Sequence, residues 1–331
     1  MDMRAIRRRF FAWPLIALPL ATATLTGLLL LFAVMEGGDP PRRAAVNEVT
    51  PSSHPISILP PLPPVDERRR ALGERLFGDP RLSGDGSRSC ATCHDLRTNG
   101  ATSRQRDVGL DGVELPLNTA TVFNATLSFR LGWEGRARGL EVQTETLLRN
   151  PAIMGADIQV VLQRLSADPG LVAEFRDVYR RRLDKAALLD ALATFQRSLV
   201  TPRSRFDRWL GGAAEAITPE EHEGYLLFRS IGCSACHQGV NIGGNLFQQH
   251  GIFHALAAPE PRVLRVPSLR NVAATAPYFH DGSAATLEDA VRGMGLAQLN
   301  LVMEQAQVAS IVAFLRTLTG SYRGNPVTAP Q

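Results

Sequence analysis

The sequence predicts an all-α fold with long loops, arranged as two similar helical halves. From Asp66 onward apolar residues recur at helical spacing, and no segment shows the alternation of apolar and polar residues that is typical of strands. A weak internal repeat indicates that the halves are related: Gly73-x-x-Leu76-Phe77 in the first matches Gly224-x-x-Leu227-Phe228 in the second. With 331 residues, the chain is long enough for about two domains.

The first half is expected to begin and end with a helix. A short helix starts after Asp66 and stops at Asp79-Pro80, because proline cannot continue a helix and because Leu72, Leu76 and Phe77 share one face. A longer helix is predicted from Asp184 to Val200. Its buried side is expected to carry Leu188, Leu189, Leu192, Phe195 and Leu199.

Three helices are expected in the second half. The sequence Thr218-Pro219-Glu220-Glu221 is a capping box with proline at the first helical position, so a helix begins there. Thr286 to Asp289 begins another, which we expect to end near Gly293 and Gly295. The last helix is predicted from about Ala306 to Leu318, with Gly320 as its stop.

The N-terminus is typical of a targeting segment. Basic residues precede an apolar run from Phe10 to Met35, which is long enough for a membrane-spanning helix of roughly 20 residues. This order places the N-terminus in the cytoplasm and the rest of the chain in the periplasm. We favour an uncleaved inner-membrane anchor over residues 1–36. The alternative is a cleaved signal peptide, but the Ala-x-Ala sequence at Ala21 to Ala23 lies inside the apolar run.

Residues 37–65 are rich in proline and predict an extended spacer, in which His54 is expected to be solvated. A boundary near Arg203 to Glu220 then divides the chain into a first domain, residues 66–205, and a second domain, residues 206–321. The net charge of +4 comes partly from the N-terminal arginines. No basic run with interleaved aromatic residues follows, so binding to nucleic acid is not predicted.

All four cysteines fall into two Cys-x-x-Cys-His motifs, Cys90-Ala91-Thr92-Cys93-His94 and Cys233-Ser234-Ala235-Cys236-His237. Two thiols at this spacing can bond the two vinyl groups of one haem, and the adjacent histidine can then ligate the iron. A redox dithiol needs no histidine, and a zinc ribbon would bring its two cysteine pairs much closer in sequence. The motifs therefore predict two covalently bound haem c groups.

The residue at the sixth position of each iron decides whether the haem transfers electrons or performs chemistry. Outside the N-terminal segment, three methionines could supply a thioether: Met154, Met294 and Met303. Met294 lies between two glycines at an expected helix end, where backbone can approach a haem. Spacing alone leaves the choice open, because a lone methionine is usually part of a core.

The region from Leu72 to Gly320 resembles the bacterial dihaem cytochrome c peroxidase family, which implies two cytochrome-c-like helical domains with haems facing across their interface. The resemblance is carried by motifs in the family's order: Leu72-Gly73-x-x-Leu76-Phe77-x-Asp79-x-Arg81-Leu82-Ser83, Asn118-x-x-Thr121-Val122-Phe123-Asn124, Trp133-x-Gly135-Arg136-Ala137, Gly232-Cys233-x-x-Cys236-His237-x-Gly239, Val266-Pro267-Ser268-Leu269-Arg270-Asn271-Val272 and Pro277-Tyr278-Phe279-His280-Asp281-Gly282.

The resemblance assigns roles to individual residues. Met294, fourteen positions after His280, matches the methionine that ligates the second, electron-entry haem. Trp133 matches the tryptophan between the two haems, and Gln143 matches a glutamine in the distal pocket of the first, peroxidatic haem.

The resemblance also implies calcium at the domain interface, held by neutral oxygens as a hard cation prefers. Three residues match the family's calcium ligands, the last two through backbone carbonyls: Asn118, Thr275 and Pro277.

Two positions depart from the family pattern. The family usually has a histidine sixteen positions after the first proximal histidine, where this chain has Leu110. The family's catalytic glutamate is replaced by Ile153 in Asn150-Pro151-Ala152-Ile153-Met154, and isoleucine cannot move the proton that peroxide cleavage requires. Glu145 is a nearby carboxylate in the sequence.

The resemblance predicts a periplasmic peroxidase that reduces hydrogen peroxide with electrons from a small cytochrome c or copper protein. One alternative is an electron carrier or haem sensor that has lost the peroxidase site. Another is a protein-modifying oxidase like the related methylamine-utilisation enzyme, whose methionine ligand is replaced by tyrosine, whereas this chain keeps Met294. The sequence leaves the oligomeric state open, with a homodimer as one arrangement.

Overall fold

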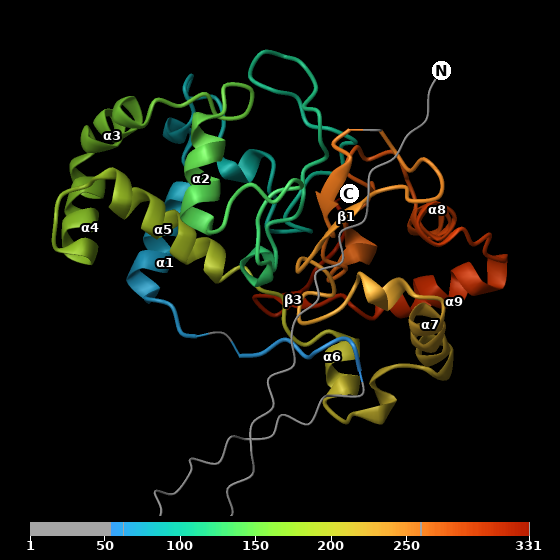
Figure 1. Ribbon diagram of the computed structural model, residues 1–331. Helices are drawn as coiled ribbons and strands as arrows, with labels where there is room; N and C mark the ends of the chain where they lie inside the picture. The colour runs from blue at the N-terminus through green and yellow to red at the C-terminus, as the bar shows by residue number, and fades with distance from the viewer. Residues whose placement is uncertain (1–53, 62, 259, 331) are drawn as a thin grey trace, which may run out of the picture. The chain divides into compact units, whose positions relative to one another are not determined.

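The computed structural model describes residues 54–61, 63–258 and 260–330, and within them the fold is helix-rich (Figure 1). The first half contains the helices α1 (Glu67–Phe77), α2 (Leu140–Arg149), α3 (Ile158–Ser166), α4 (Pro169–Tyr179) and α5 (Lys185–Arg197). The second contains α6 (Arg205–Leu210), α7 (Pro219–Ser230), α8 (Leu287–Leu299) and α9 (Gln305–Arg316).

Four very short strands are added to the expected helices. They form two antiparallel pairs, β1 (Phe247–Gln249) with β2 (Val263–Arg265), and β3 (Ser321–Tyr322) with β4 (Asn325–Pro326). Each strand has only two or three residues, which is too short for an alternating pattern to be visible in the sequence.

The helices predicted at the ends of both halves are confirmed, with the expected caps. Asp66 caps α1 by accepting hydrogen bonds from Arg68 N and Arg69 N, and Thr218 forms the predicted capping box with Glu221. The helix predicted from Asp184 begins after that residue but ends at Arg197. The sequence analysis did not predict α2, α3, α4 or α6.

The predicted end of α8 near Gly293 and Gly295 is wrong, because the helix continues to Leu299. Gly295 is a packing position: a Cβ added there would lie 2.6 Å from Cε of Met303. The helix stops instead at Asn300, whose left-handed backbone (φ 51°) is one that asparagine tolerates. Met294 therefore lies on a continuous helix and not at its end.

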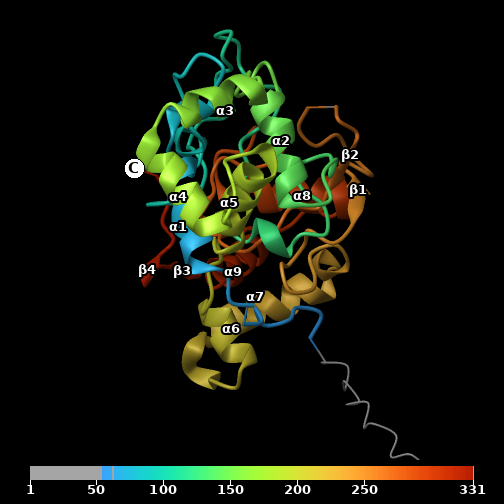
Figure 2. The ribbon, with the colours of Figure 1, turned by 90° about the vertical axis from the view of Figure 1, so that its left-hand side faces the viewer.

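Each half is built around one pair of packed helices, α1 with α5 and α7 with α9 (Figures 1 and 2). In each helix pair, the glycine of the Gly-x-x-Leu-Phe repeat lies at the point where the two helices approach most closely. A Cβ added at Gly73 would overlap the carbonyl oxygen of Ala191, and one at Gly224 would overlap that of Ser310. The repeat seen in the sequence is thus a repeated close helix contact.

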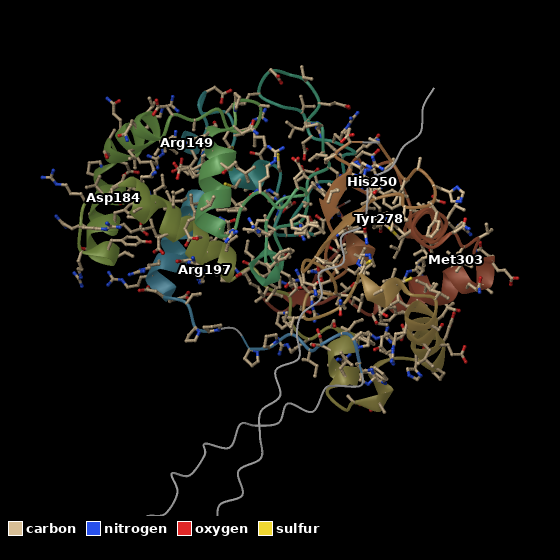
Figure 3. All side chains as sticks on the ribbon, viewed as in Figure 1. Arg149, Asp184, Arg197, His250, Tyr278 and Met303 are labelled. Carbon is tan, nitrogen blue, oxygen red and sulfur yellow. The ribbon has the colours of Figure 1, made fainter. Side chains whose placement is uncertain are left out.

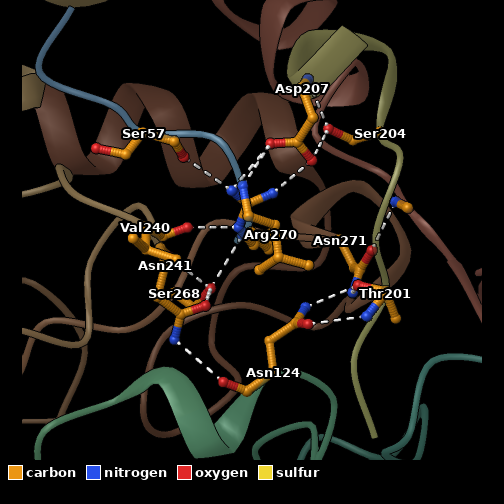
Figure 4. A network of polar contacts seen from close by, with 12 residues as sticks. Ser57, Asn124, Thr201, Ser204, Asp207, Val240, Asn241, Ser268, Arg270 and Asn271 are labelled. Carbon is orange, nitrogen blue, oxygen red and sulfur yellow. Dashed lines mark hydrogen bonds and ion pairs between the residues drawn. The ribbon is translucent and has the colours of Figure 1, made fainter. Parts of the chain in front are cut away.

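Buried polar side chains join the two halves (Figure 4). Thr201 Oγ1 accepts hydrogen bonds from Asn124 Nδ2 at 2.7 Å and from Asn271 Nδ2 at 2.9 Å. Within the second half, Arg270 and Asp207 form an ion pair in which the side chains are 1% and 5% exposed. Buried groups of this kind are stable only when fully paired, so they fix one arrangement of the segments that carry them.

Both ends of the described chain pack against segments that are distant from them in sequence. Residues 54–61 run along the second half, where Ile56 pairs with Gly239 and is 1% exposed. At the other end, Val327 belongs to the core of the first half. The proline-rich segment therefore ends as a strap on the second half, and His54 is half-buried there rather than solvated.

The predicted anchor over residues 1–36 and most of the predicted spacer lie outside the described residues. Within the described part of the chain, no helix has both the length and the apolar character needed to cross a membrane.

Candidate functional site

The first Cys-x-x-Cys-His motif lies on a short 3₁₀ turn, Cys90–Thr92, against the core of the first half. Nδ1 of His94 is 2.9 Å from the carbonyl oxygen of Gly100. This contact orients the ring and leaves Nε2 as the atom that can ligate a metal. Burial lowers the pKa of His94, which favours the neutral form that a metal requires.

The second motif has the same kind of turn in the other half, but Nδ1 of His237 is buried without a hydrogen-bond partner among the described residues. Cys233–Ala235 forms the equivalent 3₁₀ turn, and burial lowers the pKa of His237 to about 4. The ring of His94 lies 6.4 Å from Phe77, at an interplanar angle of 46°, and the ring of His237 lies 6.4 Å from Phe228, at 50°. The Leu-Phe repeat therefore places one phenylalanine beside each histidine.

None of the four cysteines forms a disulfide, and all four are partly buried. Burial raises the pKa of Cys90 to about 12 and that of Cys233 to about 11, whereas reactive dithiols have a lowered thiol pKa. Cys90 packs against the first core and Cys233 against the second. These positions argue against a redox dithiol and against one zinc site shared by both pairs.

Trp133 and His280 face each other between the halves. Their rings are 6.4 Å apart at 71°, and the two residues are joined through Asn118. Asn118 N donates to the carbonyl oxygen of His280 at 2.7 Å, and Trp133 Nε1 donates to the carbonyl oxygen of Asn118 at 2.7 Å. Two predicted site residues, Trp133 and Asn118, are therefore in direct contact.

A buried cation lies beside this pair. Arg265 is 8% exposed, its Nε donates to the carbonyl oxygen of Gly132, and its backbone N donates to that of Trp133. Burial lowers the pKa of Arg265, and no carboxylate of the described residues pairs with it. An unpaired buried guanidinium is costly, so this position is suited to an anion that the polypeptide does not supply.

Two buried imidazoles add to this region. His250 follows β1 in the second half (Figure 3). Its ring centroid is 4.6 Å from that of His280. Nε2 of His280 and Nε2 of His250 are both buried without a hydrogen-bond partner among the described residues.

Comparison with known proteins identifies the type of site. A family model described as di-haem cytochrome c peroxidase matches residues 67–215. The cytochrome c551 peroxidase of Nitrosomonas europaea is 36% identical over 289 residues, covering 82% of this chain and 86% of the relative. That of Pseudomonas aeruginosa is 38% identical over 279 residues, covering 78% and 80%.

The chain belongs to the di-haem cytochrome c peroxidase family. The fold agrees: a solved MauG-like protein associated with microbial copper homeostasis matches with a TM-score of 0.70 and 28% identity, over 83% of this chain and 96% of that one.

The residues of this di-haem cytochrome c peroxidase fit two haem c groups. Each half offers two free thiols and a neutral histidine beside a buried phenylalanine. Haem propionates are anions, and the region between the halves holds the unpaired Arg265 and the unpartnered Nε2 of His280. The donor set thus agrees with the family's cofactor: Arg265 has carbonyl partners but no carboxylate, and Nε2 of His280 has no partner among the described residues.

The structure shows that the internal repeat continues beyond the Cys-x-x-Cys-His motifs, with Asn124 in the first half aligned with Asn271 in the second. The sequence analysis missed this alignment. Asn124 and Asn271 both have left-handed backbone, with φ of 60° and 63°, and an isolated bridge follows each, Leu131 with Ala137 and Tyr278 with Ala284. In this register Trp133 corresponds to His280.

The same register aligns the helices that follow, since Leu140 and Leu287 are the first residues of α2 and α8. It makes Leu147 on α2 the counterpart of Met294 on α8, and both side chains are half-buried. At this matching position α8 in the second half therefore carries a thioether, whereas α2 in the first half carries only a hydrocarbon side chain.

Gln143 lies on the same helix, α2, with its side-chain amide beside Gly132, the residue before Trp133. The structure therefore brings Gln143 near the tryptophan that the sequence predicts between the haems. It also places Gln143 one turn before Leu147.

The two departures from the family pattern are neighbours in space. Leu110 N donates to the carbonyl oxygen of Ala152 at 2.9 Å, and a Cβ added at Gly155 would lie 2.9 Å from Cδ1 of Leu110. Ile153 lies within this turn and packs against the first core. Leu110 and the turn that carries Ile153 thus lie side by side, and both residues are apolar where the family has polar groups.

Glu145 does not compensate for this loss. Its carboxylate pairs with Lys185 at 3.1 Å and with Arg149 at 3.0 Å, and the hydrogen bond from Lys185 lowers its pKa. Arg149 is at the C-terminal end of α2 (Figure 3). A carboxylate held ionised by two cations is a poor proton donor.

Sequence reasoning missed Arg265 and the pairing of Leu147 with Met294, and it used His280 only as a reference position. The counterpart of Met294 was accessible from the sequence, because the spacing between the repeated positions is the same from Asn124 to Leu147 as from Asn271 to Met294. Arg265 carries no sequence signal, since a lone arginine is usually exposed.

Proposed function

We propose that this chain reduces hydrogen peroxide to water with electrons from a small cytochrome c or copper protein. The proposal rests on one observation above all: two matching Cys-x-x-Cys-His sites are each accompanied by a helix, and the helices differ at one matching position, Met294 on α8 and Leu147 on α2. A haem with a methionine ligand is suited to electron transfer, whereas a haem without a sixth protein ligand can bind peroxide.

In this proposal the second site is the electron entry and the first is the peroxidatic site. Cys233, Cys236, His237 and Met294 hold the second haem. Cys90, Cys93 and His94 hold the first. When bound, haem supplies the one-electron chemistry and an iron that can bind peroxide.

The residues between the sites orient the two cofactors. Trp133 is fixed by its hydrogen bond to Asn118 and by Arg265 N, so its ring has one orientation toward His280. Arg265 would pair with a propionate, and Gln143, beside Gly132, would present its amide to the distal pocket of the first haem.

Calcium at the interface is part of the proposal. Nδ2 of Asn118 donates to the carbonyl oxygens of Arg104 and Gln105, at 3.3 and 3.0 Å, which leaves its Oδ1 as a neutral ligand. Thr275 and Pro277 would add backbone carbonyls, and a hard cation prefers such oxygens.

The proposed domains are residues 66–205 and 206–321, preceded by the anchor and the spacer. A periplasmic location with an inner-membrane anchor, and a homodimer as one arrangement, complete the proposal. Support for the location comes from the basic and apolar order of the N-terminus and from covalent haem attachment.

A second candidate function, electron carrier or haem sensor, is favoured by the apolar residues Leu110 and Ile153 at the two positions where the family has polar groups. Reduction of peroxide needs two protons as well as two electrons, and these positions supply neither a proton donor nor an acceptor. The oxidase alternative is disfavoured because Met294 is retained on α8.

A steady-state assay separates the two candidates. The holoprotein is mixed with reduced small cytochrome, and oxidation of the cytochrome is followed with and without peroxide. Oxidation that depends on peroxide is expected for the peroxidase. Rapid electron exchange with the cytochrome but no consumption of peroxide would instead support the carrier.

A further inference from the structure

A series of aromatic rings runs from the second proximal histidine toward the surface. Ring centroids are separated by 6.4 Å from His237 to Phe228, 5.2 Å from Phe228 to Phe314, and 5.2 Å from Phe314 to Tyr225. Tyr225 is fully buried, and its ring is 5.7 Å from Trp209, which is partly exposed. The series ends in the two side chains, tyrosine and tryptophan, that lose an electron most readily.

The hydroxyl of Tyr225 has a proton acceptor. Its oxygen is 3.0 Å from Nδ1 of His54, on the strap of residues 54–61. Burial raises the pKa of Tyr225, so the phenol keeps its proton, and the hydroxyl donates to His54 in the tautomer that leaves Nδ1 unprotonated. Arg229 lies over the ring, with Cζ 5.5 Å from its centroid. This explains why His54 is half-buried against Tyr225 and Trp209.

The first half has no such arrangement. The residue after Gly73, which corresponds to Tyr225, is Glu74, and it pairs with Arg70 and Arg323. The ring series there runs from His94 to Phe77 and on to Phe195, 5.3 Å away, and contains no tyrosine or tryptophan. The ring series behind the first proximal histidine therefore lacks the oxidisable side chains that the series behind the second one contains.

The hydrogen bond between Tyr225 and His54 determines where positive charge would reside if Tyr225 were oxidised. Removal of an electron from a buried phenol would leave a positive charge in the core, which is costly. If the proton moves to His54 at the same time, the tyrosine stays neutral, and the charge resides on a half-buried imidazole at the protein edge. The neutral histidine needed for this is favoured, because burial and the nearby Arg229 and His222 lower the pKa of His54.

We propose that Tyr225 and His54 form a redox-active pair that delivers one electron to the second haem when that haem is over-oxidised. The phenolic O–H bond breaks, the electron goes to the haem, the proton goes to His54 Nδ1, and a neutral tyrosyl radical remains. Trp209 then returns an electron, taken from an external one-electron reductant such as a phenol, and His54 returns the proton. The proposal rests on the peroxidase function, since peroxide supplies the oxidising equivalents.

The test uses holoprotein grown with ring-deuterated tyrosine and treated with peroxide in the absence of an electron donor. Rapid freezing and electron paramagnetic resonance should detect an organic radical whose spectrum changes with the label. Tyr225→Phe keeps the ring but removes the hydroxyl, and it should abolish the tyrosyl signal and bleach the haems several-fold faster.

Tyr322→Phe is the matched control. Tyr322 is half-buried and its ring contacts Phe123 at 5.0 Å, but it lies against the first core, away from His54. This variant should behave as the wild type. His54→Gln retains a hydrogen-bond acceptor without a base, and it should lower the yield of radical although Tyr225 is present.

Some outcomes would overturn the proposal. One is a tyrosyl signal of wild-type size in Tyr225→Phe, and another is equal loss of the signal in Tyr322→Phe. If peroxide does not oxidise the haems at all, the peroxidase function fails, and hexachloroiridate(IV) is then used as a one-electron oxidant. Absence of the Tyr225 radical under this oxidant would defeat the redox pair itself.

Discussion

The two halves of this protein share a framework and differ in what they place around it. Both have a Gly-x-x-Leu-Phe helix packed against a second helix, a Cys-x-x-Cys-His turn, and an asparagine with left-handed backbone before a short bridge. At matching positions the first half has Leu147, Trp133 and Glu74, and the second has Met294, His280 and Tyr225.

This difference teaches that the framework positions a haem and the variable positions decide its chemistry. The packed glycines and the capped turns are backbone features, so they are repeated almost unchanged. The position of Leu147 and Met294 and the rings behind each histidine are side chains, which can change without loss of the fold.

Leu147→Met should remove the main difference between the two haem sites and is expected to have the largest effect. A thioether at the register of Met294 should ligate the first iron, convert that haem to a six-coordinate low-spin state and remove most peroxide turnover. Absorption and paramagnetic resonance spectra report the change. Leu147→Ile is the control of similar size, and if Leu147→Met gives the spectrum of this control, the register is wrong.

Ile153→Glu should restore a proton-transferring group in the first half. A positioned acid–base side chain contributes typically about 10²–10⁴-fold, and peroxide turnover should rise by up to that factor. Ile153→Gln, which has similar shape but no transferable proton, should not reproduce the gain. Rapid wild-type turnover that Ile153→Glu leaves unchanged would mean that another group moves the proton.

Gly73→Ala and Gly224→Ala test whether the two helix pairs are equivalent. Each added methyl overlaps a carbonyl oxygen of the facing helix, and overpacking of this kind should reduce the free energy of unfolding by about 3 kcal/mol in either half. Chemical denaturation measures the loss. Gly78→Ala is the control, because a Cβ there lies 3.8 Å from its nearest neighbour. A large effect at only one of the two glycines would show that the pairs are not equivalent.

Thr201→Val removes the hydroxyl that both halves share. The side-chain amides of Asn124 and Asn271 would then each lose a buried acceptor, which should cost about 2 kcal/mol of unfolding free energy. Thr146→Val, on the exposed face of α2, should cost much less. Equal effects of the two substitutions would contradict a role of Thr201 in joining the halves.

The smallest expected effect concerns pH and the strap. Because the pKa of His54 is lowered in the folded protein, the unfolded chain binds a proton more readily, and stability should fall as pH drops below about 6.5. His54→Gln should reduce this pH dependence of the denaturation midpoint. A pH dependence identical to that of the wild type would exclude His54 as one of its sources.

Much of the site could be predicted from the sequence. The two motifs fix the thiols and histidines because haem attachment depends on residues adjacent in the chain, and local structure preserves that spacing. Caps such as Asp66 and Thr218 were likewise predictable, since a capping side chain bonds backbone only two or three residues away.

Contacts between distant segments could not be predicted in this way. The end of α8 was misjudged because the sequence shows two glycines but not Met303, the side chain that packs against Gly295. His54 was interpreted as a spacer residue, and only the tertiary structure places it beside Tyr225, since the two are 171 positions apart.

The sequence alone therefore determined the number of haem sites, the thiols and histidines that hold them, and the helical class of the fold. These follow from local spacing. Only the tertiary structure decided that Leu110 lies beside the turn of Ile153, that Arg265 is a buried cation without a carboxylate partner among the described residues, and that Trp133 faces His280. The physical reason is that burial and pairing depend on which segments the packed helices and the Thr201 network bring together.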